Sequence, residues 1–149
     1  MKALSLFFVL FSLLFFTACE GPSLGGGKVK KEYFTGGKIR SEFIMTDSTE
    51  QNGQLKKYGY EGHLTSVVNI RDGVRDGMEV WYDTKGRIIR NVPYINGKIH
   101  GTLKEFYPNG EVLATIPYQS SMRNGQAFSY NKDGSVHRKV IFKNGRMIN

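Results

Sequence analysis

The 149-residue sequence has little cysteine and little proline, with one cysteine and four prolines. A single cysteine cannot form an internal disulfide, so no disulfide framework holds this fold together. The length excludes a multidomain enzyme and suits one compact domain or one short repeat array. The body of the chain also lacks a helical period in its apolar residues, which argues against a helical fold.

The sequence also lacks a recognisable catalytic or metal-binding arrangement. Its three histidines, His63, His100 and His137, occupy three different positions of the repeat described below. A metal site needs ligands that converge on one ion, and this repeat would not stack these histidines. Acidic residues are scattered, and Ser120 and Ser121 have no motif around them. We therefore predict a protein that is not an enzyme and that holds neither a metal nor a cofactor.

The N-terminal 18 residues have the composition of a secretory signal peptide. Lys2 is followed by the apolar run Ala3 to Ala18, which contains half of the ten phenylalanines. A basic start, an apolar centre and a small residue before the cleavage point are typical of such signals. As a helix the run would cover about 24 Å, short of the ~30 Å hydrocarbon core that a membrane anchor has to cross. We expect cleavage after Ala18.

The one cysteine, Cys19, directly follows this segment. The sequence Phe16-Thr17-Ala18-Cys19 resembles the bacterial lipoprotein signal, although leucine is usual at the position of Phe16. The resemblance implies that Cys19 carries diacylglycerol and acyl lipid and becomes the first residue of the mature chain. It also implies a location in the bacterial cell envelope, on the outer membrane in a diderm organism. Residues 19–28 are rich in glycine, proline and serine, and we expect them to form a flexible tether.

Residues 29–149 contain a repeat with a period of 24 residues, which amounts to about four and a half units. Asn-Gly and Asp-Gly pairs recur every 10–13 residues, and such pairs tolerate the positive φ of tight hairpin turns. The spacing predicts an all-β fold of consecutive antiparallel β-hairpins. The predicted turn glycines are Gly62, Gly73, Gly77, Gly86, Gly97, Gly101, Gly110, Gly125, Gly134 and Gly145.

Alternation between the turns suggests one apolar face and one polar face. Ile88, Val92 and Tyr94 are separated by even numbers of residues, so we expect them to share a face. Pro93 and Pro117 fall inside predicted strands, where a ladder donor is lost, so we expect a bulge or a non-hydrogen-bonded position there. The aromatic residues that recur in the repeat are Tyr58, Tyr82, Tyr94, Phe106, Tyr118, Tyr130 and Phe142.

The segment Tyr94-Ile95-Asn96-Gly97-Lys98-Ile99-His100-Gly101, followed by Phe106-Tyr107-Pro108-Asn109-Gly110, resembles the bacterial variant of the MORN repeat. The resemblance implies hairpins that form one elongated, twisted, single-layer sheet. It also implies a scaffold or interaction module, often at membranes, and some bacterial members resemble antitoxin components. Ser121 and Asn149 replace expected glycines, so the last turns are expected to be distorted.

The aromatic residues have two interpretations. They form the core of a thin sheet, or they line a groove that grips a partner. We expect most of them to be structural. Trp81 and Tyr107 are the better candidates for an exposed contact, because alternation places them opposite Tyr82 and Phe106, and with Lys104 they mark the face to test first.

The formal charge of +8 becomes +7 once residues 1–18 are removed, because only Lys2 is lost. Lys28, Lys30 and Lys31 follow the lipidated cysteine, where anionic headgroups would be within reach. The other cations fall in turns and on the polar face without the aromatic-flanked clusters of nucleic-acid binding, so we expect no nucleic-acid partner.

We therefore predict a non-enzymatic, lipid-anchored repeat scaffold that binds a protein partner or an envelope surface. An antitoxin or immunity-type protein that neutralises one cognate toxin is the alternative, and an envelope hydrolase is a distant third. A single-layer array also has open edges, and an edge near Met147 is expected to pair with a partner strand or with a second copy of the chain.

Overall fold

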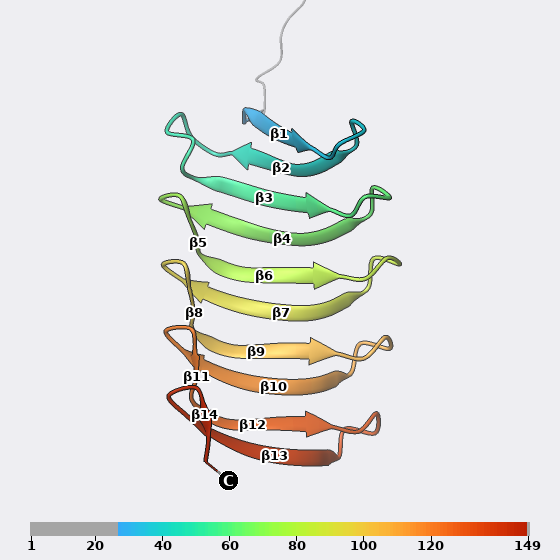
Figure 1. Cartoon of the computed structure of the whole chain (residues 1–149), viewed down its shortest axis with the longest axis vertical. Helices are drawn as coiled ribbons and strands as arrows, with labels where there is room; N and C mark the ends of the chain where they lie inside the picture. The colour runs from blue at the N-terminus through green and yellow to red at the C-terminus, as the bar shows by residue number, and fades with distance from the viewer. Residues whose placement is uncertain (1–26, 149) are drawn as a thin grey trace, which may run out of the picture.

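A computed structural model of the chain describes residues 27–148, and these residues form strands and turns of one sheet (Figure 1). The strands are β1 (Val29–Tyr33), β2 (Ile39–Met45), β3 (Gly53–Tyr58), β4 (Leu64–Arg71), β5 (Val74–Arg75), β6 (Gly77–Tyr82), β7 (Ile88–Ile95), β8 (Lys98–Ile99), β9 (Gly101–Phe106), β10 (Val112–Gln119), β11 (Met122–Arg123), β12 (Gly125–Tyr130), β13 (Val136–Lys143) and β14 (Arg146–Met147). The described range holds no helix long and apolar enough to cross a membrane.

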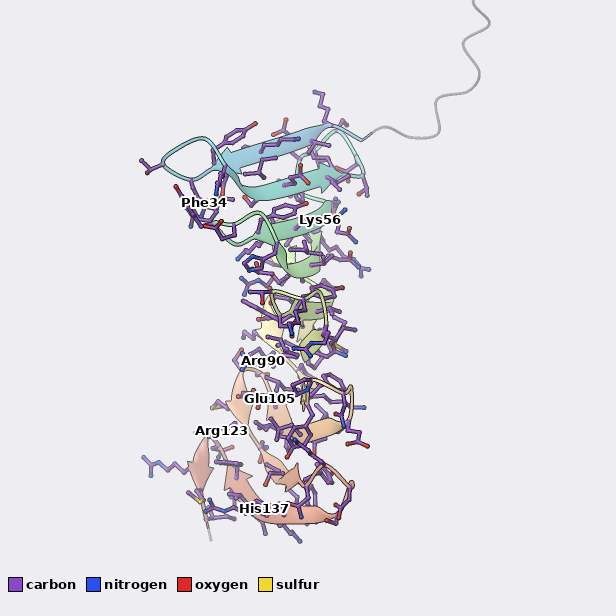
Figure 2. The ribbon with its side chains drawn as sticks, turned by 90° about the vertical axis from the view of Figure 1, so that its right-hand side faces the viewer. Phe34, Lys56, Arg90, Glu105, Arg123 and His137 are labelled. Carbon is purple, nitrogen blue, oxygen red and sulfur yellow. The ribbon has the colours of Figure 1, made fainter. Side chains whose placement is uncertain are left out.

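All strand pairs are antiparallel, and the main path follows the chain from β1 to β14. Five long hairpins stack along one axis, and the two-residue strands β5, β8, β11 and β14 lie along one side of the stack (Figure 1). The strands at the two ends are seen more nearly broadside than those in the middle, so the sheet twists along its length (Figure 2). The predicted fold class, an elongated single-layer sheet of consecutive hairpins, is confirmed.

Wide turns close the long hairpins at one side of the sheet. In the turn Asp83 to Gly86, the amide of Gly86 donates to the carbonyl of Asp83, and the amide of Asp83 donates to the carbonyl of Arg87. Asp83 also accepts hydrogen bonds from the amides of Lys85 and Arg87, which holds the turn in shape. All ten glycines predicted in turns have positive φ. Gly77, Gly101 and Gly125 lie at the first residue of strands β6, β9 and β12, and not inside a turn.

Tight two-residue turns lie at the other side, where both central residues have positive φ. Ser120 and Ser121 adopt the same conformation, with φ of 48° and 67°, so serine keeps the turn undistorted, contrary to expectation. Each tight turn donates one backbone hydrogen bond to the preceding repeat, for example from the amide of Gly97 to the carbonyl of Arg75 at 2.9 Å. These bonds join neighbouring repeats at one edge of the stack.

A β-bulge in every long hairpin overturns the prediction of one apolar face. Tyr82 pairs with Ile88 and Trp81 pairs with Arg90, so Ile89 is an extra residue without a partner on β6. The bulge reverses the alternation, and Ile88 therefore points to the face opposite Val92 and Tyr94. Thr65, Leu113 and His137 are the corresponding extra residues in three other hairpins.

The sheet consequently has two apolar half-faces on opposite sides. We call one the Tyr94 face, which carries Leu55, Val68, Val92, Tyr94 and Leu103, and the other the Tyr82 face, which carries Tyr58, Tyr82, Ile88, Phe106 and Tyr130. Val68, Val92 and Leu103 are buried, with exposed fractions of 1%, 5% and 8%. The best-packed apolar side chains thus lie on the Tyr94 face.

Pro93 and Pro117 sit in regular pairs and not in the bulges. The carbonyl of Pro93 accepts a hydrogen bond from the amide of His100, and the carbonyl of Pro117 accepts one from Asn124. In an antiparallel sheet, the N–H and C=O groups of one residue point toward the same neighbouring strand. The carbonyl of Pro93 points toward His100, so the backbone of Pro93 forms no hydrogen bond with Met78, its partner on β6. Of the two alternatives expected for these prolines, the non-hydrogen-bonded position is therefore confirmed.

Candidate functional site

The three residues proposed from the sequence as a contact face do not share a face. Trp81 pairs with Arg90 on the Tyr94 face, whereas Lys104 pairs with Asn91 on the Tyr82 face. Tyr107 follows β9, and its hydroxyl donates to the carbonyl of Tyr130 at 2.8 Å. Trp81 and Tyr107 are half-buried. The structure therefore separates these residues, and Tyr107 links one hairpin to the next.

The recurring aromatic residues are divided between the faces. Tyr94, Tyr118 and Phe142 lie on the Tyr94 face, and the other four lie on the Tyr82 face. All seven are half-buried, which fits the structural role expected for them in a thin sheet. Arginines of the short strands cover two of the rings: Arg75 lies 5.3 Å from the centre of Tyr94, and Arg123 lies 4.3 Å from that of Phe142.

A buried glutamate interrupts the apolar row of the Tyr94 face. Glu79 pairs with Val92 and occupies the repeat position that holds Leu55 and Leu103 elsewhere. Its exposed fraction is 0%, and neither carboxylate oxygen has a hydrogen-bond partner. Its ionic neighbour is Arg75, with 3.9 Å between Nε and Oε2. Burial raises the pKa of Tyr94, and the nearby charge of Glu79 raises it further.

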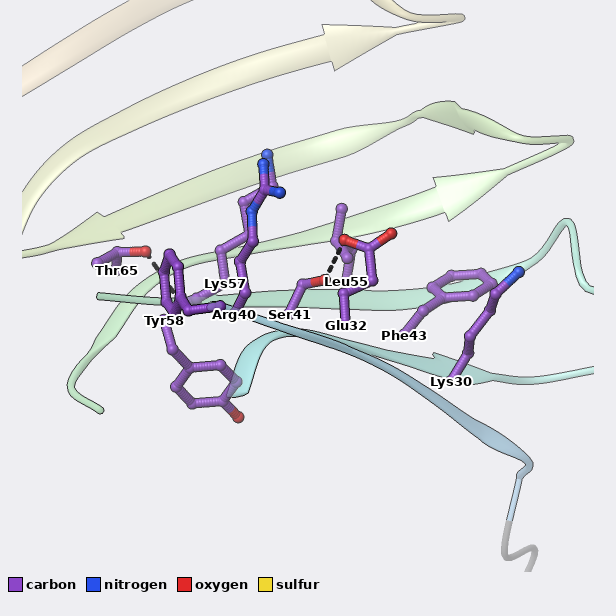
Figure 3. A pocket seen from close by; sticks show the side chains of 10 residues that line it. Lys30, Glu32, Arg40, Ser41, Phe43, Leu55, Lys57, Tyr58 and Thr65 are labelled. Atoms are coloured by element: carbon purple, nitrogen blue, oxygen red, sulfur yellow. Dashed lines mark hydrogen bonds between the residues drawn. The ribbon is translucent and has the colours of Figure 1, made fainter. Parts of the chain in front are cut away.

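A cleft of about 340 Å³ opens on the Tyr94 face over strands β1 to β4 (Figure 3). Two rows of cross-strand neighbours on β1, β2 and β3 line it. In one row Lys30 pairs with Phe43, which pairs with Leu55, and in the other Glu32 pairs with Ser41, which pairs with Lys57. The guanidinium of Arg40 and the carboxylate of Glu32 rise from the same side of the strands, whereas the Tyr58 ring is directed to the other side (Figure 3). The residues that line the cleft are Lys30, Glu32, Phe34, Arg40, Ser41, Phe43, Leu55, Lys57, Tyr58 and Thr65.

The cleft has an excess of positive charge that the protein does not neutralise. Within residues 27–148, the charged groups of Lys30, Arg40 and Lys57 form no ion pair and no hydrogen bond. The one carboxylate, that of Glu32, accepts a hydrogen bond from Oγ of the buried Ser41 at 2.9 Å. The cleft can therefore hold an anion without displacing an internal partner of these cations.

A hydrogen-bonded cluster lies behind the cleft on the other face. Tyr58 donates to Glu42 at 2.6 Å, and Lys31 forms an ion pair with the same carboxylate at 3.1 Å. The hydrogen bond from Tyr58 and the contact with Lys31 lower the pKa of Glu42. Burial, together with the bond to Glu42, raises the pKa of Tyr58 to about 12. This cluster ties β1, β2 and β3 together beneath the cleft.

The described part of the chain shows no grouping for metal chemistry. Across residues 27–148, no three histidine, cysteine, aspartate or glutamate side chains are grouped so as to hold a metal ion. His63 packs against Gly59, where an added Cβ would lie 2.4 Å from the His63 ring. The amide of His100 is bonded to Pro93, and His137 is the exposed extra residue of a bulge. Cys19 and Ala18 lie outside the described residues.

Reasoning from the sequence missed both the cleft and Glu79. Glu79 had a detectable signal, because the same repeat position holds Leu55, Leu103 and Ala127 in the second, fourth and fifth hairpins. The cleft had no comparable signal, since its cations come from three strands and Arg40 is the extra residue of a bulge. Only the strand register brings them together.

Comparison with known proteins agrees with the repeat architecture. The model of the MORN repeat variant family matches residues 99–120, which extend from β8 through the hairpin of β9 and β10. No curated protein matches the chain. The family match, together with the stacked hairpins of the described residues, supports a protein built of MORN-type repeats.

Proposed function

We propose that this chain is a non-enzymatic repeat scaffold that is anchored by lipid to the bacterial cell envelope and binds a protein partner there. The observation that carries the binding role is the single-layer architecture. Every described strand belongs to one sheet, and no other described element covers either face. Both faces are therefore available to a partner along the whole stack.

The Tyr82 face provides an apolar surface of the kind that partners cover. Met78 pairs with Pro93, and Ile95 follows on the same face of β7. The exposed fractions of Met78 and Ile95 are 46% and 51%. Apolar side chains that are exposed next to one another on a folded protein mark interaction surfaces more often than isolated ones do.

The proposed anchor rests on the sequence around Cys19. The apolar run that ends at Ala18 is followed at once by the one cysteine, and the array begins ten residues later, at Val29, within a basic segment. Lipid chains contribute about 0.8 kcal/mol per buried methylene, so three acyl chains on Cys19 would hold the protein permanently at a membrane. Lys28, Lys30 and Lys31 would then lie near anionic headgroups.

The anchor is tested by metabolic labelling with an alkyne fatty acid in a bacterial host. We expect the wild-type chain to take up the label and to sediment with membranes, and the Cys19→Ser variant to lose both properties. Membrane recovery and gel mobility that are the same for the two proteins would overturn the anchor.

The binding role is tested separately, by in-cell crosslinking and recovery of the tagged full-length chain. We expect Ile95→Glu to lose a specific crosslinked protein, and the matched variant Thr84→Glu, in an exposed turn, to retain it. A set of crosslinks that is identical for the wild type and Ile95→Glu would exclude this surface.

A further inference from the structure

We propose that the cleft on the Tyr94 face over strands β1 to β4 binds a phosphate monoester whose phosphate is attached to a small apolar or ring-shaped body. This inference goes beyond the proposed scaffold role, and it depends neither on the lipid anchor nor on the protein partner. The cleft volume of about 340 Å³ lies at the lower end of the range of roughly 300–1,000 Å³ that is usual for small-molecule sites.

The charge of the cleft matches a dianion. Three cationic side chains, Lys30, Arg40 and Lys57, face one carboxylate, that of Glu32, which leaves a surplus of two positive charges. A phosphate monoester carries about −1.5 to −2 charges at pH 7, whereas a carboxylate or a phosphodiester carries one negative charge. Arg40 supplies a planar set of donors, and the two lysines supply mobile point charges, a combination that suits phosphate oxygens.

The rest of the array shows that this arrangement is particular to the cleft. At the repeat position of Lys57, the fourth hairpin has Glu105, which forms an ion pair with Arg90 at 2.7 Å. In the cleft the corresponding neighbour of Lys57 is Ser41, which is uncharged and already bonded to Glu32. Glu105 of the fourth hairpin is thus ion-paired with Arg90, whereas Lys57, at the same repeat position in the cleft, has no ionic partner among residues 27–148.

The apolar half of the cleft faces the remainder of the ligand. Phe43 and Leu55 are direct neighbours across β2 and β3, and both are half-buried. Phe34 extends this surface toward the turn after β1. A ring attached to the phosphate would cover these side chains while its charged end meets the cations.

The test is isothermal titration of the full-length chain, purified as the cell produces it, with four small probes. Phenyl phosphate combines the charge and the ring, phenyl sulfonate lowers the charge to one, inorganic phosphate removes the ring, and phenol removes the charge. We expect phenyl phosphate to bind most tightly and phenyl sulfonate to bind about tenfold more weakly, because charge-assisted hydrogen bonds are lost. Equal affinity for phenyl phosphate and phenyl sulfonate would overturn the assignment to a dianion.

Side-chain variants test whether the cleft is the site. We expect Lys57→Ala and Arg40→Ala each to weaken phenyl phosphate binding by about tenfold, and Glu32→Gln to tighten it roughly threefold. Lys104→Ala is the matched control, since Lys104 is an exposed lysine on the Tyr82 face, and it should bind like the wild type. Glu32→Gln keeps the test decisive if a lysine variant fails to fold. Unchanged binding by Glu32→Gln and by a folded Lys57→Ala would overturn the proposal.

Vesicles distinguish a lipid headgroup from a free ester as the source of the phosphate. Vesicles that contain phosphatidic acid present a monoester, and vesicles that contain phosphatidylglycerol present a diester. Retention on phosphatidic acid vesicles alone, lost in Lys57→Ala and displaced by phenyl phosphate, would support the site with a lipid as the source. Binding of phenyl phosphate without cleft-dependent vesicle retention would support the site with a free ester.

Discussion

The Oε2 atom of the fully buried Glu79 lies 3.9 Å from Nε of Arg75, a side chain that is 38% exposed. This separation is too long for a hydrogen bond, and both oxygens of Glu79 lack a hydrogen-bond partner. A carboxylate that is removed from water without hydrogen bonds opposes folding, and a distant cation offsets only part of that cost. The third hairpin therefore carries a polar group where its neighbours carry leucine.

Replacement of this carboxylate should stabilise the protein. We expect Glu79→Leu to raise the free energy of unfolding by about 1–3 kcal/mol, which is the usual cost of burying a polar group that has no hydrogen-bond partner. Arg75 keeps its contact with the Tyr94 ring in this variant. Urea unfolding monitored by circular dichroism measures the change.

The reverse exchange at the same repeat position is the control. Leu103→Glu should destabilise the fourth hairpin, because it introduces a buried carboxylate in place of a side chain that is 8% exposed. A Glu79→Leu protein that is less stable than the wild type would show that Glu79 has a favourable partner.

Tyr58 and Glu42 should make stability depend on pH in two separate ranges. The folded-state pKa of Tyr58 is raised from 10.0 to about 12, so the stability from its neutral hydroxyl is complete below pH 10 and is lost as the pH rises from 10 to 12. The pKa of Glu42 is lowered from 4.5, so its contribution is present above pH 4.5 and is lost as the pH falls through its lower folded value.

Tyr58→Phe tests the alkaline range. The difference in unfolding free energy between the wild type and this variant should shrink between pH 10 and pH 12. The ultraviolet absorbance of tyrosinate should show one fewer tyrosine titrating near pH 12 in the variant than in the wild type. A difference that stays constant across this range would contradict the assignment.

Gly101→Ala should destabilise the fourth hairpin for two reasons. Its φ is +108°, and an added Cβ would lie 3.3 Å from Cγ of Pro93. We expect a loss of about 1–3 kcal/mol, which is typical of a side chain forced into such a conformation. Thermal unfolding by calorimetry measures it.

The matched variant is Gly110→Ala, where φ is +90° and no atom lies within 4 Å of the added Cβ. The difference between the two variants isolates the contact with Pro93. If this contact matters, the additional substitution Pro93→Ala should restore part of the stability of Gly101→Ala but none of that of Gly110→Ala.

Tyr107→Phe should weaken the junction between the last two long hairpins. It removes the hydrogen bond from the hydroxyl to the carbonyl of Tyr130, which is worth about 1 kcal/mol. Tyr33→Phe is the control, because the hydroxyl of Tyr33 is bonded to nothing within residues 27–148 and its side chain is exposed. Hydrogen exchange should show faster opening of β12 and β13 in Tyr107→Phe alone.

The turns of this fold could be predicted from the sequence because their chemistry is local. Positive φ is tolerated by glycine and asparagine, and the recurrence of Asn96-Gly97 and Asn144-Gly145 therefore reveals where the chain reverses. Antiparallel pairing and the single layer follow from turns that are spaced so closely. The same local reasoning identified the seven recurring aromatics.

The face of the sheet to which each side chain points could not be derived in this way. Ile88 and Ile89 are both apolar, as are Val112 and Leu113, so alternation gives the same pattern whichever of the two residues is extra. The bulge decides which one pairs, and it reverses the direction of every side chain on one side of it. Arg40, one of the cations of the unrecognised cleft, is such an extra residue. The expected contact face failed for a different reason: Lys104 corresponds to Val80 in the 24-residue repeat, so strand alternation alone places it on the face opposite Trp81.

The backbone hydrogen bonds between successive tight turns also fix the distance between neighbouring hairpins along the stack. Each hairpin adds two strands, and neighbouring strands lie about 4.8 Å apart, so one 24-residue unit lengthens the stack by roughly 10 Å. The hydrogen bonds at Gly97, Ser121 and Gly145 repeat this step from hairpin to hairpin. Insertion or removal of one unit would therefore shift everything beyond it by a fixed distance, and the separation between the cleft and any ligand held farther along the sheet is set by the number of intervening repeats.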